Sequence, residues 1–456
     1  MPGPSRRSVI LSKRSESKDR LASLCVPQHL GAPSICRLFG KWVGNHERRV
    51  PHLSRVSRAL AFAAKAGKHR FLSARLAIPL LISLLALTAC HSHDFPQYPP
   101  SYREYAYIAN SASGTITVLD VVNMRVDREL RVGQNPVAVA VNPARNEAYV
   151  VNSGVEGGQG SLSVIDATKN AVAATIQLHR KPISIDIDSA GTLAYVANSE
   201  SNSISVIDLK ARREIAQIGT GEQPVAARIT PDDKTLLVAN LRGNSTSIID
   251  GSTRHVRSIF GDCPGAADIA ILPDSSKAFV ACSAGHQVMA LALAGAKETP
   301  ASSDRIESML DVGHGPVHLA LKPDGGEVFV SNSFSDSISE IDTSKDDVGG
   351  AYMMGDDPVR GLVSSDNSLL YVANYRSQYV TIYSIDEGKR LPLSMTPHVG
   401  DGPTALALSS SGLFLFVVDN RSNDVAVMRT DTRAIIAILP TGRAPSAIAV
   451  KAFKEQ

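Results

Sequence analysis

The strongest constraint on the fold of this chain is a short pattern that recurs eight times between residues 107 and 419. Each copy has an aromatic residue or leucine, then valine or isoleucine, then a small or branched residue, and it usually ends in asparagine. The fourth residues of the copies are Asn110, Asn152, Asn198, Asn240, Cys282, Asn332, Asn374 and Asp419. Four of the seven successive spacings are 42 residues. β-Branched residues alternate around these copies, and a period of two predicts strands rather than the helices of a solenoid.

Each copy opens a unit that divides into four short strands separated by turns. In the third unit we predict strands at 193–198, 203–208, 214–218 and 225–230. A Gly-x-x-Pro turn precedes nearly every fourth strand, and we align the units on its proline, which presets the backbone of the turn. These turns are Gly133/Pro136, Gly221/Pro224, Gly261/Pro264, Gly313/Pro316, Gly355/Pro358, Gly400/Pro403 and Gly442/Pro445.

Four-stranded antiparallel units of this length are typical of β-propeller blades. The sequence therefore predicts an all-β propeller of eight four-stranded blades, or seven if the degenerate unit from Cys282 to Gly313 does not form its own blade. The repeat begins at a strand of the kind that lies second from the centre of a blade. It ends at a strand of the kind that lies innermost, 445–450. We expect this last strand to complete the first blade, because ring closure removes exposed sheet edges.

The combination of Tyr-Val-x-Asn, Ser-Ile-Ser-Val-Ile-Asp and Gly-x-x-Pro over residues 102–453 resembles the YVTN-repeat β-propeller family of prokaryotic envelope proteins. The resemblance implies the fold. It implies little about function, because members of the family include surface, binding and lactonase-like proteins.

Charge is divided unevenly along the chain. Lys and Arg outnumber Asp and Glu by sixteen to three in residues 1–76, which leaves 31 basic and 41 acidic residues downstream. The repeat region is therefore acidic overall, and we expect no nucleic-acid partner.

A segment at 68–89 has the layout of a signal peptide. Basic residues precede the apolar run 76–86, which is too short to span a membrane as a helix. Leu-Thr-Ala-Cys at 87–90 resembles the lipobox of bacterial lipoproteins, which implies cleavage before Cys90 and its acylation with chains such as palmitate. The alternative is an ordinary signal peptide with an incidental cysteine. His91 follows the cysteine, and by resemblance this favours the outer membrane, with the protein facing the periplasm or the surface.

The remaining domain boundaries follow from this assignment. Residues 1–67 have no sustained periodicity, and we interpret them as an unstructured leader or as the product of a mis-assigned translation start. Residues 90–101 form a lipidated, Pro-rich tether, and 102–456 form the propeller.

Polar residues on the innermost strands are candidates for a binding site, because these strands line the central channel. Counted from the turn proline, Asp186, Arg228 and Asp268 occupy the fourth position in consecutive units, and His318 and Arg360 occupy the second. We favour a ladder of ion pairs between blades. The alternative is a polar channel mouth that binds a small anionic or metal-linked ligand.

Cys263 and Cys282 are the cysteines of the repeat region. Cys263 precedes an innermost strand and Cys282 ends the strand beside it, so their ends meet, although we expect Cys282 to face a residue near Asp268. A disulfide and two free thiols both remain open. We interpret the recurrent asparagine as a turn cap that bonds backbone groups of the next turn.

We find no catalytic constellation and no metal-ligand spacing, so we assign no catalytic residue, metal or cofactor, while a metal at the channel mouth stays open. The sequence favours a monomeric, non-catalytic envelope lipoprotein that binds a protein or a small molecule or acts as a scaffold. The alternatives are a lactonase-like hydrolase and a structural surface-layer component.

Overall fold

The computed structural model describes residues 96–295, 303–385, 391–392 and 398–453. The leader, the signal peptide and Cys90 lie outside the described residues. The residues from Pro96 to Gln456 belong to one compact unit. All regular elements within the described part of this unit are strands.

Thirty-two strands are described. In chain order, the first sixteen are β1 Glu104–Asn110, β2 Thr115–Asp120, β3 Arg125–Arg131, β4 Pro136–Val141, β5 Glu147–Asn152, β6 Gln159–Asp166, β7 Ala171–Arg180, β8 Pro182–Ile187, β9 Leu193–Asn198, β10 Ser203–Asp208, β11 Arg213–Gly219, β12 Pro224–Ile229, β13 Thr235–Asn240, β14 Ser245–Asp250, β15 Val256–Phe260 and β16 Ala266–Ile271. The others are β17 Lys277–Cys282, β18 Gln287–Ala292, β19 Arg305–Asp311, β20 Pro316–Leu321, β21 Glu327–Asn332, β22 Ser337–Asp342, β23 Asp347–Met353, β24 Pro358–Val363, β25 Leu369–Asn374, β26 Val380–Ser384, β27 Leu391–Pro392, β28 Pro403–Leu408, β29 Phe414–Asp419, β30 Asp424–Arg429, β31 Ile435–Pro440 and β32 Pro445–Ala452.

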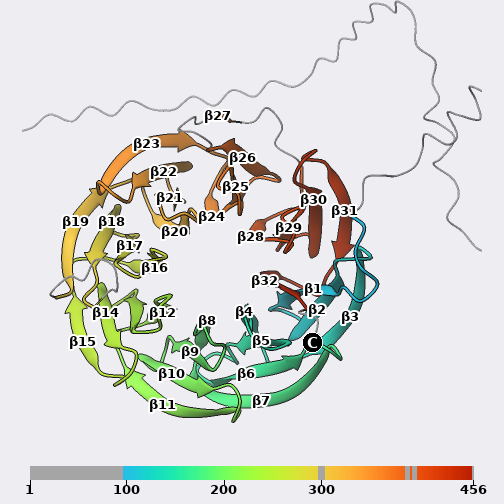
Figure 1. Ribbon diagram of the computed structural model, residues 1–456, viewed down its shortest axis with the longest axis horizontal. Helices are drawn as coiled ribbons and strands as arrows, with labels where there is room; N and C mark the ends of the chain where they lie inside the picture. Colours follow the sequence, from blue (N-terminus) through green and yellow to red (C-terminus); the bar gives the residue numbers. More distant parts are fainter. Residues whose placement is uncertain (1–95, 296–302, 386–390, 393–397, 454–456) are drawn as a thin grey trace, which may run out of the picture. The chain divides into compact units, whose positions relative to one another are not determined.

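The strands form eight four-stranded antiparallel sheets around a central channel, which confirms the predicted propeller with eight blades (Figure 1). Blade 1 has the order β3-β2-β1-β32, and blades 2 to 8 follow as β4–β7, β8–β11, β12–β15, β16–β19, β20–β23, β24–β27 and β28–β31. The degenerate unit therefore forms blade 5. The predicted ring closure is also confirmed, because β32 pairs with β1 from Glu104↔Ala452 to Asn110↔Pro445.

The core lies mainly between neighbouring blades. One cluster joins Tyr195, Val206 and Ile218 of blade 3 to Leu236 and Val238 of blade 4, and comparable clusters fill the other contacts. A single four-stranded sheet could not bury both of its faces, so each blade depends on its neighbours for burial.

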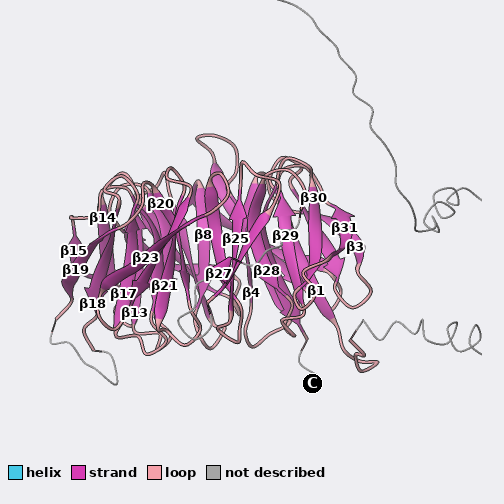
Figure 2. Cartoon of the chain, turned by 90° about the horizontal axis from the view of Figure 1, so that it is seen from above, coloured by secondary structure: helices cyan, strands magenta, loops and turns pink. Residues whose placement is uncertain are grey.

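The ring has two faces, which are seen edge-on in Figure 2. We call one the asparagine face, because the recurrent asparagines and the Gly-x-x-Pro turns lie there. The turns between the innermost and second strands lie on the opposite face, where residues 99–103 also enter the propeller and Phe453 donates its N–H to the carbonyl of Arg103 at 2.9 Å. Within the described residues, no helix is long and apolar enough to cross a bilayer.

The recurrent asparagines are structural, but their bonds differ from the predicted turn caps. Each donates from Nδ2 to a hydroxyl on the next strand, as between Asn198 and Ser205 at 2.9 Å or Asn374 and Thr381 at 2.8 Å; the hydroxyl follows seven residues later in five units and eleven residues later at Asn152. One such contact is present at each of the six recurrent asparagines, Asn110, Asn152, Asn198, Asn240, Asn332 and Asn374. The turn glycine packs on this asparagine, because a Cβ at Gly221 would lie 2.8 Å from the side chain of Asn240.

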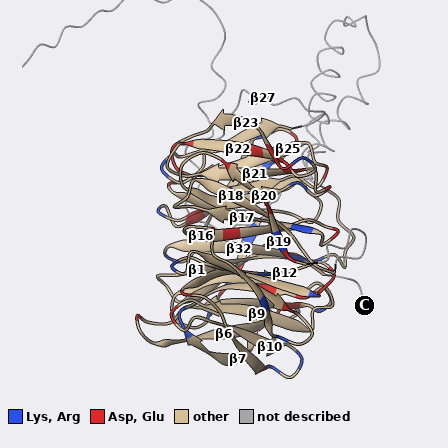
Figure 3. Ribbon diagram, turned by 90° about the vertical axis from the view of Figure 1, so that its left-hand side faces the viewer, with Lys and Arg blue, Asp and Glu red and all other residues tan. Residues whose placement is uncertain are grey.

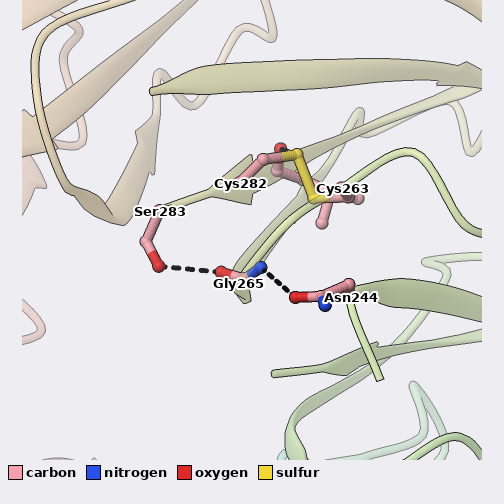
Figure 4. Close-up of a disulfide and its surroundings, with 6 residues drawn as sticks. Asn244, Cys263, Gly265, Cys282 and Ser283 are labelled. Atoms are coloured by element: carbon pink, nitrogen blue, oxygen red, sulfur yellow. Dashed lines mark hydrogen bonds between the residues drawn. A yellow bond between two sulfur atoms is a disulfide. The ribbon is translucent and has the colours of Figure 1, made fainter. Parts of the chain in front are cut away.

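Blade 5 replaces this glycine and asparagine with a disulfide between Cys263 and Cys282 (Figure 4). Cys282 pairs with Ala266 and not with a residue near Asp268, so the expected register was wrong by two residues. In the other blades the asparagine pairs with the turn proline, as Asn240 does with Pro224. Ala266 therefore takes the place of that proline, and Cys263 takes the place of the turn glycine.

This equivalence corrects the alignment of the fifth turn. The structural counterpart of Gly-x-x-Pro is 263–266 and not 261–264. The motif cannot be recognised there because cysteine replaces its glycine and alanine replaces its proline. The neighbouring backbone is held by two further bonds: Asn244 Oδ1 accepts the N–H of Gly265 at 2.9 Å, and Ser283 Oγ donates to its carbonyl at 2.8 Å. The disulfide closes a separation of 19 residues, a constraint that stabilises such a loop by about 3 kcal/mol.

Candidate functional site

The central channel contains a cavity of about 490 Å³ whose wall is divided into two halves. The half contributed by blades 8, 1 and 2 is mainly apolar and consists of Val137, Ala138, Val139, Ala140, Ala405, Leu406, Ala447 and Ile448, with the hydroxyl groups of Thr404 and Ser446. Blades 3 to 7 carry the charged residues and His318. A cavity that is apolar on one side, with a few convergent polar groups on the other, is the usual form of a small-molecule site.

The corrected register moves Asp268 along the channel. Asp268 lies level with His318 and Arg360, at the position nearer the asparagine face, and not level with Asp186 and Arg228 as the alignment on turn prolines predicted. Asp186 and Arg228 lie two residues deeper, about 7 Å along the strand. If the fifth unit is aligned on Cys282, which stands at the position of the recurrent asparagine, instead of on Pro264, Asp268 falls at the correct level.

The contacts of the deeper pair, Asp186 and Arg228, connect blade 3 to blade 4 and blade 4 to blade 5. Asp186 Oδ2 accepts the backbone N–H of Ile229 on the next blade at 2.9 Å. Burial raises the pKa of Asp186, while the Arg228 charge and two backbone N–H groups oppose that rise. Arg228 donates to the carbonyl of Ala227 at 3.2 Å and lies 3.6 Å from Asp268 Oδ1.

Asp268 and His318 continue the same series of contacts. Asp268 Oδ2 accepts the N–H of Leu319 at 3.1 Å and lies 3.7 Å from His318 Nε2. Burial raises the pKa of Asp268, but His318, Arg228 and Arg360 together outweigh it and hold the pKa below its usual value.

His318 is a neutral imidazole at pH 7. Its Nδ1 accepts the N–H of Gly361 on the next blade at 3.2 Å, so a proton can reside only on Nε2, toward Asp268. Burial, together with the charge of Arg360, lowers the pKa of His318 to about 3, although the charge of Asp268 opposes them. A histidine in this state is a poor general base, because its only lone pair, on Nδ1, already accepts the N–H of Gly361.

The contacts of four of the five residues thus fit the ladder interpretation, with backbone N–H groups as partners more often than side-chain charges. Arg360 ends the series. Among the described residues its guanidinium has no hydrogen bond and no ion pair, although it lines the cavity and is solvent-exposed there. Its enclosure by the channel wall lowers its pKa, and the charge of Asp268 opposes this effect while the charge of Arg228 adds to it.

No group of three or more His, Cys, Asp or Glu side chains that could hold a metal ion is present in the described part of the chain. Figure 3 shows basic and acidic positions interspersed over the blades, so no broad basic surface is seen there. The polar half of the channel is therefore the candidate site with the most specific geometry.

The fold and this channel define the class of the protein as an eight-bladed β-propeller. A family model, the seven-bladed β-propeller lactonase, matches residues 356–440. The matched segment includes Arg360, but Asp186, Arg228, Asp268 and His318 lie outside it. No curated protein matches the chain.

Several solved structures share the fold. The dihydro-haem d1 dehydrogenase NirN, solved in complex with DHE, has a TM-score of 0.61 at 12% identity and covers 78% of this chain and 77% of its own. Apo AztD of Citrobacter koseri has a TM-score of 0.57 at 13% identity, covering 78% and 99%. A putative 6-phosphogluconolactonase of Bacteroides fragilis has a TM-score of 0.52 at 15% identity, covering 78% and 99%. These likenesses concern the fold alone.

Proposed function

We propose that this protein is a non-catalytic lipoprotein of the cell envelope that binds a small molecule at the asparagine-face mouth of its channel. The observation that carries the proposal is the divided cavity wall, in which Arg360 has no hydrogen bond or ion pair with any described residue while its neighbours are engaged. Charged groups without partners usually cost stability, and they are retained where they serve binding.

An exported location agrees with the disulfide of blade 5, because disulfides form and persist in oxidising compartments. The anchor follows from the resemblance of 87–90 to a lipobox. The YVTN-type repeat agrees with an envelope protein, and the ring needs no second copy to bury its blades, so we propose a monomer.

The anchor is tested by replacing the cysteine that would be acylated. We expect the natural protein to sediment with outer membranes and to require detergent for release, whereas Cys90→Ala should appear mainly in the soluble fraction, because several acyl chains make a durable anchor and an unmodified tether does not. Ser92→Ala is the matched control and should remain with the membrane. Membrane retention of the Cys90→Ala variant would contradict the anchor.

A lactonase-like hydrolase is the second candidate, supported by the family match at 356–440 and by the proximity of Asp268 and His318. The site argues against it, because His318 is neutral and Asp268 already accepts a backbone N–H. A hydrolytic water would lack a base with a free lone pair at this place.

Turnover distinguishes the two functions. We expect the purified protein to hydrolyse gluconolactone and related lactones no faster than buffer, while a metal and small-molecule thermal-shift screen gives at least one compound that raises the melting temperature by several degrees at saturation. Arg360→Ala should abolish that shift. Lactone turnover that His318→Gln or Asp268→Asn removes would overturn the binding function in favour of hydrolysis.

A further inference from the structure

Among the four charged residues that line the channel, Arg360 alone has no hydrogen bond or ion pair with another described residue. Arg228 is satisfied by Ala227 and Asp268, and Asp268 also faces His318. The carboxylates of Asp186 and Asp268 balance the charges of Arg228 and Arg360, but Asp268 acts on Arg360 only through space, so the N–H groups of Arg360 make no hydrogen bond within the described part of the chain. A guanidinium offers a planar set of N–H donors that fits an oxyanion in bidentate geometry.

The surroundings of Arg360 favour the binding of an anion by its guanidinium over simple hydration of that group. It lies in the channel at the level nearer the asparagine face, so a ligand entering from that side meets it early. The cavity encloses it enough to lower its pKa, and an anion placed there would interact more strongly than at an open surface.

The other half of the wall indicates what the rest of the ligand is made of. The half of the wall formed by blades 8, 1 and 2, which we call the alanine wall, offers a mainly apolar surface together with the hydroxyl groups of Thr404 and Ser446. A fully hydrated inorganic ion would gain nothing from this surface, whereas a carbon skeleton would bury apolar area against it.

We propose that the channel binds a small organic oxyanion, with Arg360 contacting the oxyanion and the alanine wall contacting the carbon body. This inference rests on the proposed function and specifies its ligand class. A carboxylate and a phosphate ester share the head-group chemistry, and the probes below distinguish them.

The test is titration of the purified protein with benzoate and with inorganic phosphate, followed by calorimetry and by thermal unfolding at fixed ionic strength. At least one probe should bind and raise the melting temperature, with benzoate ahead if the natural ligand is a carboxylate and phosphate ahead if it is a phosphate ester. Arg360→Ala should weaken binding about tenfold or more, because it removes charge-assisted bonds.

Arg376→Ala is the matched control. Arg376 is an exposed arginine on the asparagine face, where it pairs with Asp357 at 3.4 Å outside the channel, and its loss should leave the affinity unchanged. A second readout guards against misfolding: without ligand, Arg360→Ala should melt at the same temperature as the natural protein or higher, since the guanidinium has no bond to lose.

Two results would overturn the oxyanion site. One is the absence of any shift with both probes, and the other is a shift that Arg360→Ala retains. If a different compound from the broader screen still binds and the channel variants abolish it, the proposed binding function survives and only the ligand class is wrong. If no compound binds at all, both proposals fail.

Discussion

Removal of residues 445–456 should leave a protein that aggregates, or that melts on the order of 10 °C or more below the natural protein, because the ring can no longer close. The deletion exposes the edge of β1, which pairs with β32 along its whole length. It also removes Ile448 and Val450 from the cluster between blades 8 and 1. Burial of each such side chain contributes about 1.5–3 kcal/mol, and an exposed edge invites association with other chains.

Differential scanning calorimetry and size-exclusion chromatography measure this effect. Removal of 454–456 alone is the control and should change neither the melting temperature nor the elution volume. A soluble monomer with an unchanged melt after the longer deletion would show that β32 is dispensable, and the closed ring would then need another explanation.

The second large effect concerns Asp419, which stands in blade 8 where six other blades have asparagine. The carboxyl group is fully buried, its Oδ2 accepts the N–H of Gly400 at 3.0 Å, and Asp424 lies beside it. Burial, together with the charge of Asp424, raises the pKa of Asp419 to about 8. Ala426 occupies the place of the hydroxyl that pairs with asparagine in the other blades.

The sign of the pH dependence follows from this shift. The folded state holds the proton of Asp419 more tightly than the unfolded chain, so the contribution of Asp419 to stability is complete below about pH 4 and declines as the pH rises to about 8. Each unit of pKa corresponds to about 1.4 kcal/mol. Ionised Asp419 therefore lowers the stability of the folded state considerably at neutral pH, even after local relaxation.

Asp419→Asn should therefore raise the free energy of unfolding by roughly 2 kcal/mol at pH 8 and by little at pH 4, since the amide needs no proton and can donate to Asp424. Urea unfolding at several pH values measures the difference. The reciprocal variant Asn374→Asp should lose stability with rising pH in the same window. Equal effects of Asp419→Asn at pH 4 and pH 8 would show that Asp419 does not titrate there.

The fold was predictable because its signal is repeated. Eight copies of one four-residue pattern determine the number of blades, and in the third unit the predicted strands differ from β9–β12 by at most one residue at either end. The role of β32 followed from the same logic, because a repeat that starts at a second strand must find its innermost strand elsewhere.

The site was predictable only in part, because it depends on exceptions to the repeat. The five polar residues were recognisable as departures from alanine, but the level of Asp268 was not, since Pro264 follows Cys263 directly and imitates the usual turn proline. Which residues satisfy each other depends on side-chain reach between blades. The sequence does not contain that information at any one position, so the free guanidinium of Arg360 became visible only in the structure.

The cysteine pair of blade 5 has a wider consequence. Cys263 and Cys282 stand where other blades place a glycine and an asparagine. The contact between these two positions can therefore be either the packing of a glycine against a hydrogen-bonded asparagine or a covalent disulfide. Homologous propellers should therefore carry the pair at other places around the circle, and reducing conditions would loosen only the blade that bears it.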